Sequence, residues 1–107
     1  MNKLGLLVRV VAKPEHALET AEFLRKAAAM AEAEHGTPLW CAVQLDNNNF
    51  VIFDSHVDEA GRQAHLNGPI AAKLMEAAGA GWFTAPPVIE NTTFLSSKVA
   101  ANAVATN

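Results

Sequence analysis

The chain has little of several residue types on which common kinds of site depend. Its 107 residues include one cysteine, Cys41, and no tyrosine. A single cysteine excludes an internal disulfide, a multi-cysteine zinc site and an all-cysteine iron–sulfur site. The absence of tyrosine excludes a phenol as the acid or base of a reaction. Because HxH, HExxH and clustered Cys/His patterns are also missing, we expect no dedicated metal site.

Basic residues and long apolar runs are scarce as well. Eight Lys and Arg stand against eleven Asp and Glu, for a formal net charge of -3. We therefore do not expect nucleic acid as a partner. No apolar run approaches the roughly 18 residues that a membrane span needs, and the N-terminus lacks the pattern of a signal peptide. These features predict a cytoplasmic protein without a membrane partner.

The apolar residues that are present follow the periods of strands and helices. Residues 4–12 predict a strand with two apolar faces, residues 39–46 and 50–57 a hairpin, and residues 88–95 a last strand. Pro14 begins a predicted helix whose buried stripe includes Leu18 and for which Gly36 is a plausible left-handed cap. Asp58 caps a second helix, which the turn at residues 67–69 divides in two.

The order of these elements predicts an α+β fold, a ferredoxin-like split βαβ sheet with both helices on one face. Two helices cover only one side of such a sheet, whereas the first and third strands are apolar on both sides. The simplest cover for the bare side is a second copy of the chain. We therefore expect a homodimer of sheets packed face to face, with residues 1–98 as the domain and residues 99–107 as a flexible or partner-contacting tail.

Two segments carry a resemblance to a known family. The string FVIFD at residues 50–54 and the string AHLNGP at residues 64–69, within this order of elements, resemble the antibiotic-biosynthesis monooxygenase family of dimeric α+β barrels. The resemblance covers residues 4–95. It implies a monooxygenase without metal or flavin that uses molecular oxygen on a small hydroquinone- or anthrone-like aromatic. It also implies His65 as the base and Asn67 as a hydrogen-bond donor to a substrate oxygen.

The chain departs from that family at three places. His56 stands where many relatives carry tryptophan, and Ile70 stands where several carry a second histidine. The first strand lacks the asparagine that haem-degrading relatives use, so the resemblance does not imply haem degradation. On the residues alone, His65 also fits a hydrogen-bonded helix residue without chemistry. His56 fits either the mouth of a pocket or a pair with Asp54 at the end of its strand.

Aromatic residues supply the candidate walls of a substrate pocket. Trp40 is either a pocket wall or an aromatic anchor at the dimer interface. Phe53 and Trp82 are further candidate pocket walls, although the loop that carries Trp82 could equally be a lid or a hydrophobic plug. Arg9 either faces the partner sheet and needs a counter-charge such as Asp46, Asp54 or Glu90, or binds an anionic substrate oxygen.

Two other functions fit the same sequence. The first is a non-catalytic small-molecule-binding or structural dimer that keeps the fold without the chemistry. The second is an isomerase or lyase of a small carbonyl compound, with His65 and His56 as an acid–base pair.

Overall fold

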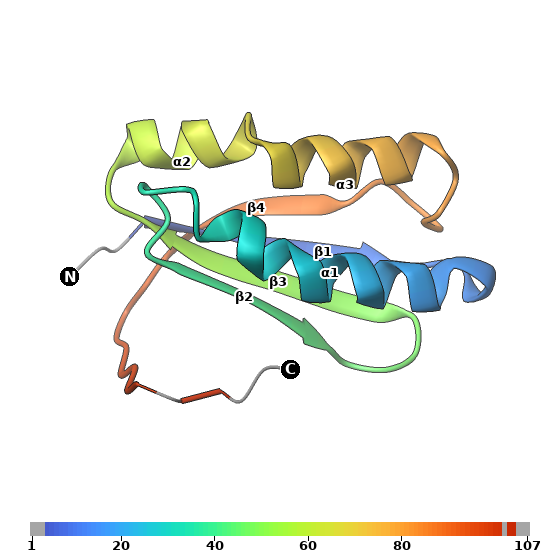
Figure 1. Cartoon of the computed structure of the whole chain (residues 1–107), viewed down its shortest axis with the longest axis horizontal. Helices are drawn as coiled ribbons and strands as arrows, with labels where there is room; N and C mark the ends of the chain where they lie inside the picture. Colours follow the sequence, from blue (N-terminus) through green and yellow to red (C-terminus); the bar gives the residue numbers. More distant parts are fainter. Residues whose placement is uncertain (1–3, 102, 105–107) are drawn as a thin grey trace.

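The computed structural model describes residues 4–101, 103 and 104 as one antiparallel sheet with helices on one side (Figure 1). The elements in chain order are β1 (Leu4–Val11), the 3-10 turn η1 (Pro14–His16), α1 (Ala17–Ala31), β2 (Leu39–Gln44), β3 (Asn49–His56), α2 (Glu59–Leu66), α3 (Pro69–Gly79) and β4 (Val88–Thr93). The strand order β2-β3-β1-β4 is that of a ferredoxin-like fold and confirms the predicted α+β class.

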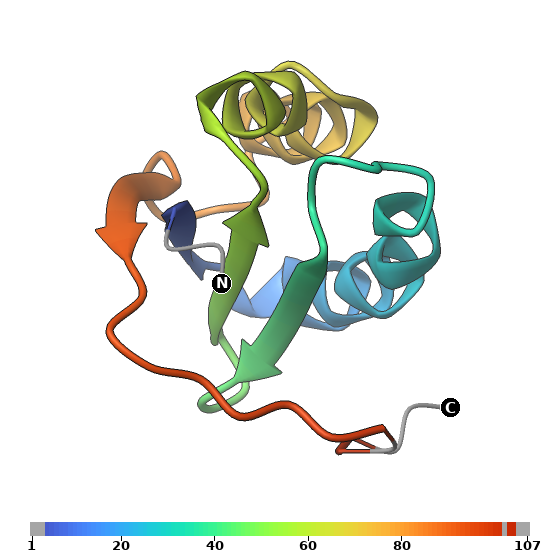
Figure 2. The ribbon, with the colours of Figure 1, turned by 90° about the vertical axis from the view of Figure 1, so that its left-hand side faces the viewer.

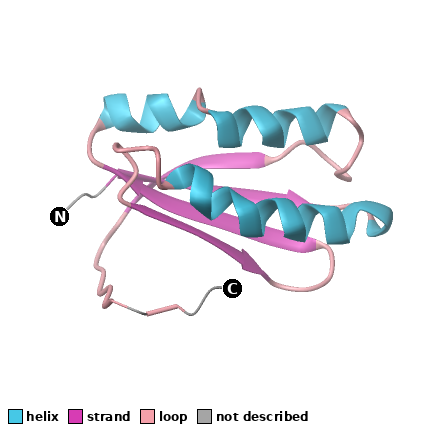
Figure 3. Cartoon of the chain, viewed as in Figure 1, coloured by secondary structure: helices cyan, strands magenta, loops and turns pink. Residues whose placement is uncertain are grey.

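The helices share one face of the sheet, as the helix and strand colours of Figure 3 show. Alternation along the strands places the buried residues on that face. In β1 these are Leu6, Val8 and Val10, and in β3 they include Phe50 and Ile52. They pack against apolar residues of the helices, so the core lies between the sheet and the helices.

The first helix differs from its prediction in which residues it buries. Leu18 is 87% exposed, whereas Thr20 is fully buried. The helix begins with the tighter η1 turn, and α1 starts only at Ala17. Thr20 can occupy a core position because its hydroxyl donates a hydrogen bond to the carbonyl of His16 at 2.8 Å. The predicted stripe was therefore wrong at Leu18.

Gly36 is not a left-handed cap, because Gly81 is the one described glycine with positive φ, at 83°. A Cβ on Gly36 would instead lie 2.9 Å from the Cα of Gly61 near the start of α2. The Gly36 carbonyl also accepts a 3.0 Å hydrogen bond from the Val57 N–H. Gly36 therefore lets the loop between α1 and β2 approach α2 closely, which brings loop residues to the end of β3.

The second helical region is divided in two, as predicted. The Asp58 carboxylate accepts a hydrogen bond from the Gly61 N–H at 2.7 Å and caps α2. Pro69 then begins α3 as a separate helix. None of the helices in the described part of the chain is long and apolar enough to cross a membrane.

No helix or strand within residues 4–101, 103 and 104 covers the sheet face away from the helices (Figure 2). Val11, Val43 and Val88 on this open face are 38–50% exposed. Arg9 lies on the same face, between Val51 and Val88 of the neighbouring strands. The segment after β4 runs past this side, and its Leu95 is 95% exposed. The domain boundary at residue 98 stays a prediction, since residues 102 and 105–107 of the tail lie outside the described residues.

Substituting Gly36→Ala tests the close contact between the loop and α2. The new methyl group would meet backbone rather than a flexible side chain, so we expect a loss of about 1–3 kcal/mol in the free energy of unfolding. Gly79→Ala is the matched control, because a Cβ there meets nothing within 4 Å. Chemical denaturation measures both variants, and equal stability of the two would contradict the described contact.

Candidate acid–base site

Five polar side chains form a connected cluster between the sheet and α2. Asp54 and His56 point to the helix side from the end of β3, and His65 comes from the last turn of α2. Glu34 and Thr37 come from the loop that Gly36 holds against α2. We call these five residues the acid–base cluster. Three separate segments of the chain therefore meet at one end of the sheet.

Carboxylates and imidazoles alternate along the cluster. Nδ1 of His65 lies 2.7 Å from Oε1 of Glu34, and Nε2 of the same ring lies 3.2 Å from Oδ2 of Asp54. The other Asp54 oxygen, Oδ1, lies 2.5 Å from Nε2 of His56. The Thr37 hydroxyl completes the chain at 3.3 Å from Nδ1 of His56. The two imidazole rings are 5.2 Å apart, with Asp54 bridging them.

The cluster is buried but not saturated with hydrogen bonds. Asp54 and His56 are fully buried, and His65 is 7% exposed. The contact between His65 Nε2 and Asp54 Oδ2 has the distance of an ion pair but not the geometry of a hydrogen bond. Oδ2 is therefore without a hydrogen-bond partner, as are Oε2 of Glu34 and the indole N–H of Trp40. Buried polar atoms are rarely left unpaired, so this unused capacity marks the cluster as a candidate functional site.

The surroundings of His65 change its proton affinity in two opposing ways. Burial lowers the pKa of His65, because a charged ring is poorly solvated there, whereas the carboxylates of Asp54 and Glu34 raise it. The carboxylates outweigh burial, so the pKa of His65 is raised above its ordinary value. Its protonated form is stabilised by two carboxylates, and its neutral form is a stronger base than free imidazole.

Nearby Cys41 is not part of this chemistry. Burial, together with the negative charge of Asp54, raises the pKa of the Cys41 thiol. Within residues 4–101, 103 and 104, no group of three or more His, Cys, Asp or Glu side chains is arranged to hold a metal ion. The carboxylates of Asp54 and Glu34 contact imidazole nitrogens and do not converge with them on one position that a metal ion could occupy.

The structure brings only some of the predicted site residues together. His56 and His65 belong to the cluster, and Trp40 lies beside it, because it is the direct partner of Asp54 across the β2–β3 pair. Trp40 packs against the core under the helices, which places it on the helix side rather than on the open face. Of the two predicted arrangements of His56, the structure shows the pair with Asp54.

The other predicted site residues lie elsewhere. Phe53 is on the open face, because it neighbours Asp54 along β3 and pairs with Cys41. Asn67 is exposed, and its amide donates to the Gln63 carbonyl at 3.0 Å. Trp82 lies in the loop after α3 and stacks on His16. Substrate contacts by Phe53, Asn67 and Trp82 therefore stay predictions.

Solved structures of known proteins share the fold of this chain. No protein-family model matches it, and no curated protein does. A solved structure provisionally named an antibiotic biosynthesis monooxygenase, from Nitrosomonas europaea, has a TM-score of 0.76 at 17% identity, covering 87% of this chain and 99% of its own. One from Caulobacter crescentus, named in the same way, has a TM-score of 0.70 at 17% identity, covering 89% and 92%. The chain therefore has the fold of the antibiotic biosynthesis monooxygenases, which the sequence predicts.

A second Nitrosomonas europaea protein is much more similar in sequence. NE2512, described as a protein of unknown function, has 46% identity and a TM-score of 0.87, over 95% of this chain and 98% of its own. The chain belongs to the same family as NE2512, and this family shares the monooxygenase fold.

Substituting Glu34→Gln tests the contact between Glu34 and His65 through stability. A His whose pKa is raised on folding stabilises the fold fully below its unfolded pKa of about 6.5, and this contribution is lost as pH rises through the folded pKa. We expect the variant to lose about 1–3 kcal/mol near pH 6, and less at higher pH. Urea denaturation across this range measures the loss. Glu32→Gln, at an exposed neighbour, is the control, and an identical pH dependence of the two variants would contradict the assignment.

Proposed function

We propose that the protein is a cofactor-independent monooxygenase that acts on a small hydroquinone- or anthrone-like aromatic. The acid–base cluster carries this proposal, because such a reaction asks the protein mainly for a positioned base beside an apolar wall. The fold shared with proteins named antibiotic biosynthesis monooxygenases supports it. His65 is the base, and Asp54 and Glu34 set its proton affinity.

The groups around the two ring nitrogens of His65 suit it to remove a proton from a substrate. A substrate O–H or activated C–H that reaches Nε2 of His65 also meets Oδ2 of Asp54, which has no hydrogen-bond partner. Glu34 on Nδ1 orients the ring and stabilises the imidazolium that forms, as the carboxylate of a catalytic triad does. The unpaired indole N–H of Trp40 is available to a substrate oxygen that becomes negative.

The substrate anion itself, rather than a cofactor, then reacts with molecular oxygen. An electron-rich anion in a buried, low-dielectric site can pass an electron directly to molecular oxygen, so the protein has only to form and hold that anion. Trp40 offers an aromatic surface for a flat ring beside the cluster. With little exposed surface at His65, substrate entry requires the loop at Gly36 or the start of α2 to move.

Acid–base isomerisation or cleavage of a small carbonyl compound is the second candidate. It is favoured by one observation, the two imidazoles that share Asp54 at a ring distance of 5.2 Å. One ring could remove a proton while the other returns one at a neighbouring atom. Such a reaction would proceed without oxygen.

Oxygen uptake with a panel of hydroquinones and anthrones tests the leading proposal. We expect His65→Gln to lower kcat by about 100-fold or more. His35→Gln, at an exposed position in the same region, should retain full activity. Uptake should rise with pH as His65 loses its proton, with a midpoint above about 6.5, and Glu34→Gln should move that midpoint to lower pH.

Three outcomes separate the candidate functions. Oxygen uptake that His65→Gln leaves unchanged contradicts the role of His65. Turnover that persists without oxygen indicates the isomerase or lyase. Thermal stabilisation by a ligand without any turnover indicates a small-molecule-binding protein that lacks catalysis.

The functional unit that we propose is a homodimer formed through the open sheet face. A second copy would cover the exposed valines of that face. Arg9 and Glu90 lie on the same face, so Arg9 of one chain could form an ion pair with Glu90 of the other. Asp54, another candidate counter-charge for Arg9, lies on the helix side instead.

Sedimentation at micromolar concentration tests the dimer. We expect two chains per particle, and we expect Val43→Glu to weaken association by about tenfold or more, because it would bury a charge in the interface. Met75→Glu, which is exposed on α3, should leave association unchanged. A monomer at this concentration would contradict the proposed interface.

A further inference from the structure

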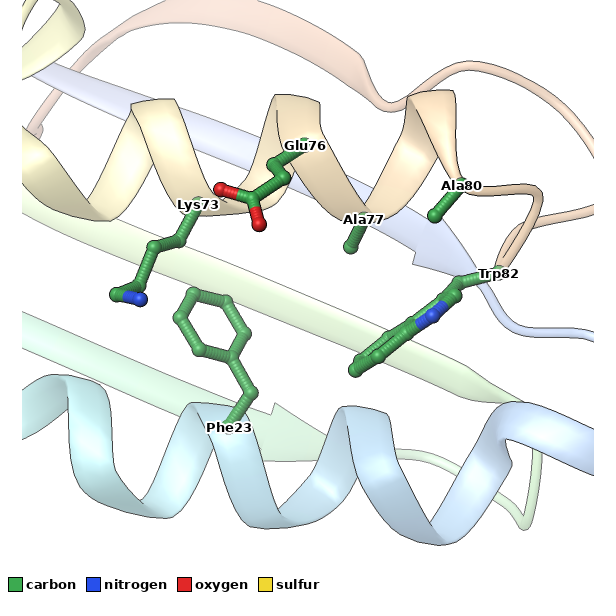
Figure 4. Close-up of a pocket in the computed structure, with 6 residues that line it drawn as sticks. All are labelled: Phe23, Lys73, Glu76, Ala77, Ala80 and Trp82. Atoms are coloured by element: carbon green, nitrogen blue, oxygen red, sulfur yellow. The ribbon is translucent and has the colours of Figure 1, made fainter.

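A surface pocket lies between α1 and α3, away from the acid–base cluster (Figure 4). Its volume is about 170 Å³. It is lined by Phe23 of α1, by residues of α3 and by the loop that follows α3; the full set is Phe23, Lys73, Glu76, Ala77, Ala80 and Trp82. The rings of Phe23 and Trp82 stand on opposite sides of the space. The small side chains of Ala77 and Ala80 leave that space open.

The Trp82 wall is held in place before any ligand arrives. Its ring stacks on His16, with centroids 5.5 Å apart and planes inclined by 7°. The backbone N–H of Trp82 donates to the Ala77 carbonyl at 3.1 Å, and the backbone carbonyl of Trp82 accepts from the Lys13 N–H at 2.8 Å. A fixed aromatic wall binds a flat ligand without an ordering penalty.

The space between the pocket walls accommodates one ring. An apolar cavity of about 150 Å³ accommodates benzene, so 170 Å³ suits a single six-membered ring. A tricyclic aromatic would extend far beyond the space between Phe23 and Trp82. The pocket therefore selects a smaller ligand than an anthrone.

The two charged residues at the pocket define the rest of the ligand. Lys73 and Glu76 both extend from α3 beside Phe23, and both are exposed. Within the part of the chain that the structure describes, neither charge is taken up by an ion pair. A ligand that carries one positive and one negative group next to its ring would satisfy both residues.

The pocket is separate from the acid–base cluster. Ala27, Ala31 and Ile70 pack into a small core between the two helices. Ala27 lies one helical turn after Phe23, and Ile70 lies about one turn before Lys73. No residue that lines the pocket belongs to the acid–base cluster, so a ligand between Phe23 and Trp82 contacts none of the five cluster side chains.

From these observations we infer that the pocket binds an aromatic α-amino acid. The side-chain ring lies between Phe23 and Trp82, the carboxylate faces Lys73, and the ammonium faces Glu76. This inference is independent of the oxygenase proposal, because it involves a different part of the molecule and no chemical step. It gives the protein a site through which a small metabolite can be sensed or carried.

Titration followed by NMR of the ¹⁵N-labelled protein tests this site. Two indole N–H signals are expected, from Trp40 and Trp82, and Trp82→Phe identifies the second. Phenylalanine should shift the Trp82 signal with millimolar affinity and leave the Trp40 signal unchanged. Alanine, which lacks the ring, should cause no shift. The probes 3-phenylpropionate and 2-phenylethylamine, which each lack one charge, should bind about 1.5- to fivefold more weakly, since an exposed charge pair contributes only about 0.2–1 kcal/mol.

Variants distinguish this pocket from non-specific binding. Ala80→Leu fills the space from an exposed position and should abolish the shift without unfolding the protein. Lys73→Met should make phenylalanine bind about as weakly as 2-phenylethylamine does, whereas Lys26→Met, at an exposed lysine of α1, should have no effect. The inference is overturned if phenylalanine leaves the Trp82 signal in place, if Ala80→Leu binds normally, or if the singly charged probes bind as tightly as phenylalanine.

Discussion

The position of His65 between the fully buried carboxylate of Asp54 and the partly buried carboxylate of Glu34 is the constraint on which the rest of the site depends. Charged groups in a protein interior are tolerated when a partner of opposite charge and hydrogen bonds accompany them. Glu34 and Asp54 together provide this for a protonated His65. Removal of either carboxylate would leave the protonated ring with one anionic partner and would lower the pKa of His65. The cluster therefore ties the loop after α1, the end of β3 and the last turn of α2 to one another.

The same constraint links the backbone contact between α2 and the loop after α1 to the proton affinity of His65. Glu34 reaches His65 only because its loop approaches α2, and this approach requires two glycines, Gly36 and Gly61, in direct backbone contact. The same approach places Thr37 against His56. Backbone packing that looks structural thus sets the proton affinity of a side chain in α2.

The sequence predicted the fold because periodicity and turn residues determine which elements form and which faces they bury. It also predicted His65, and the pairing of His56 with Asp54 as one arrangement, since both lie in or beside recognisable elements. Glu34 and Thr37 were not predicted, because their roles depend on where a loop lies in space. The parity of β3 already separated Phe53 from Asp54, and this signal could have placed Phe53 on the open face. Nothing local indicated that the Asn67 amide would bond back to its own helix.

The helix side of the sheet thus carries two separate features, a buried cluster suited to proton transfer and a surface pocket suited to a single aromatic ring. The cluster is the central one. A ¹⁵N NMR titration of the imidazole nitrogens measures its defining property directly, with the Glu34→Gln variant as the comparison. We predict that His65 titrates above the ordinary imidazole pKa of about 6.5 and that Glu34→Gln lowers its midpoint. A His65 that titrates at or below about 6.5 would contradict this.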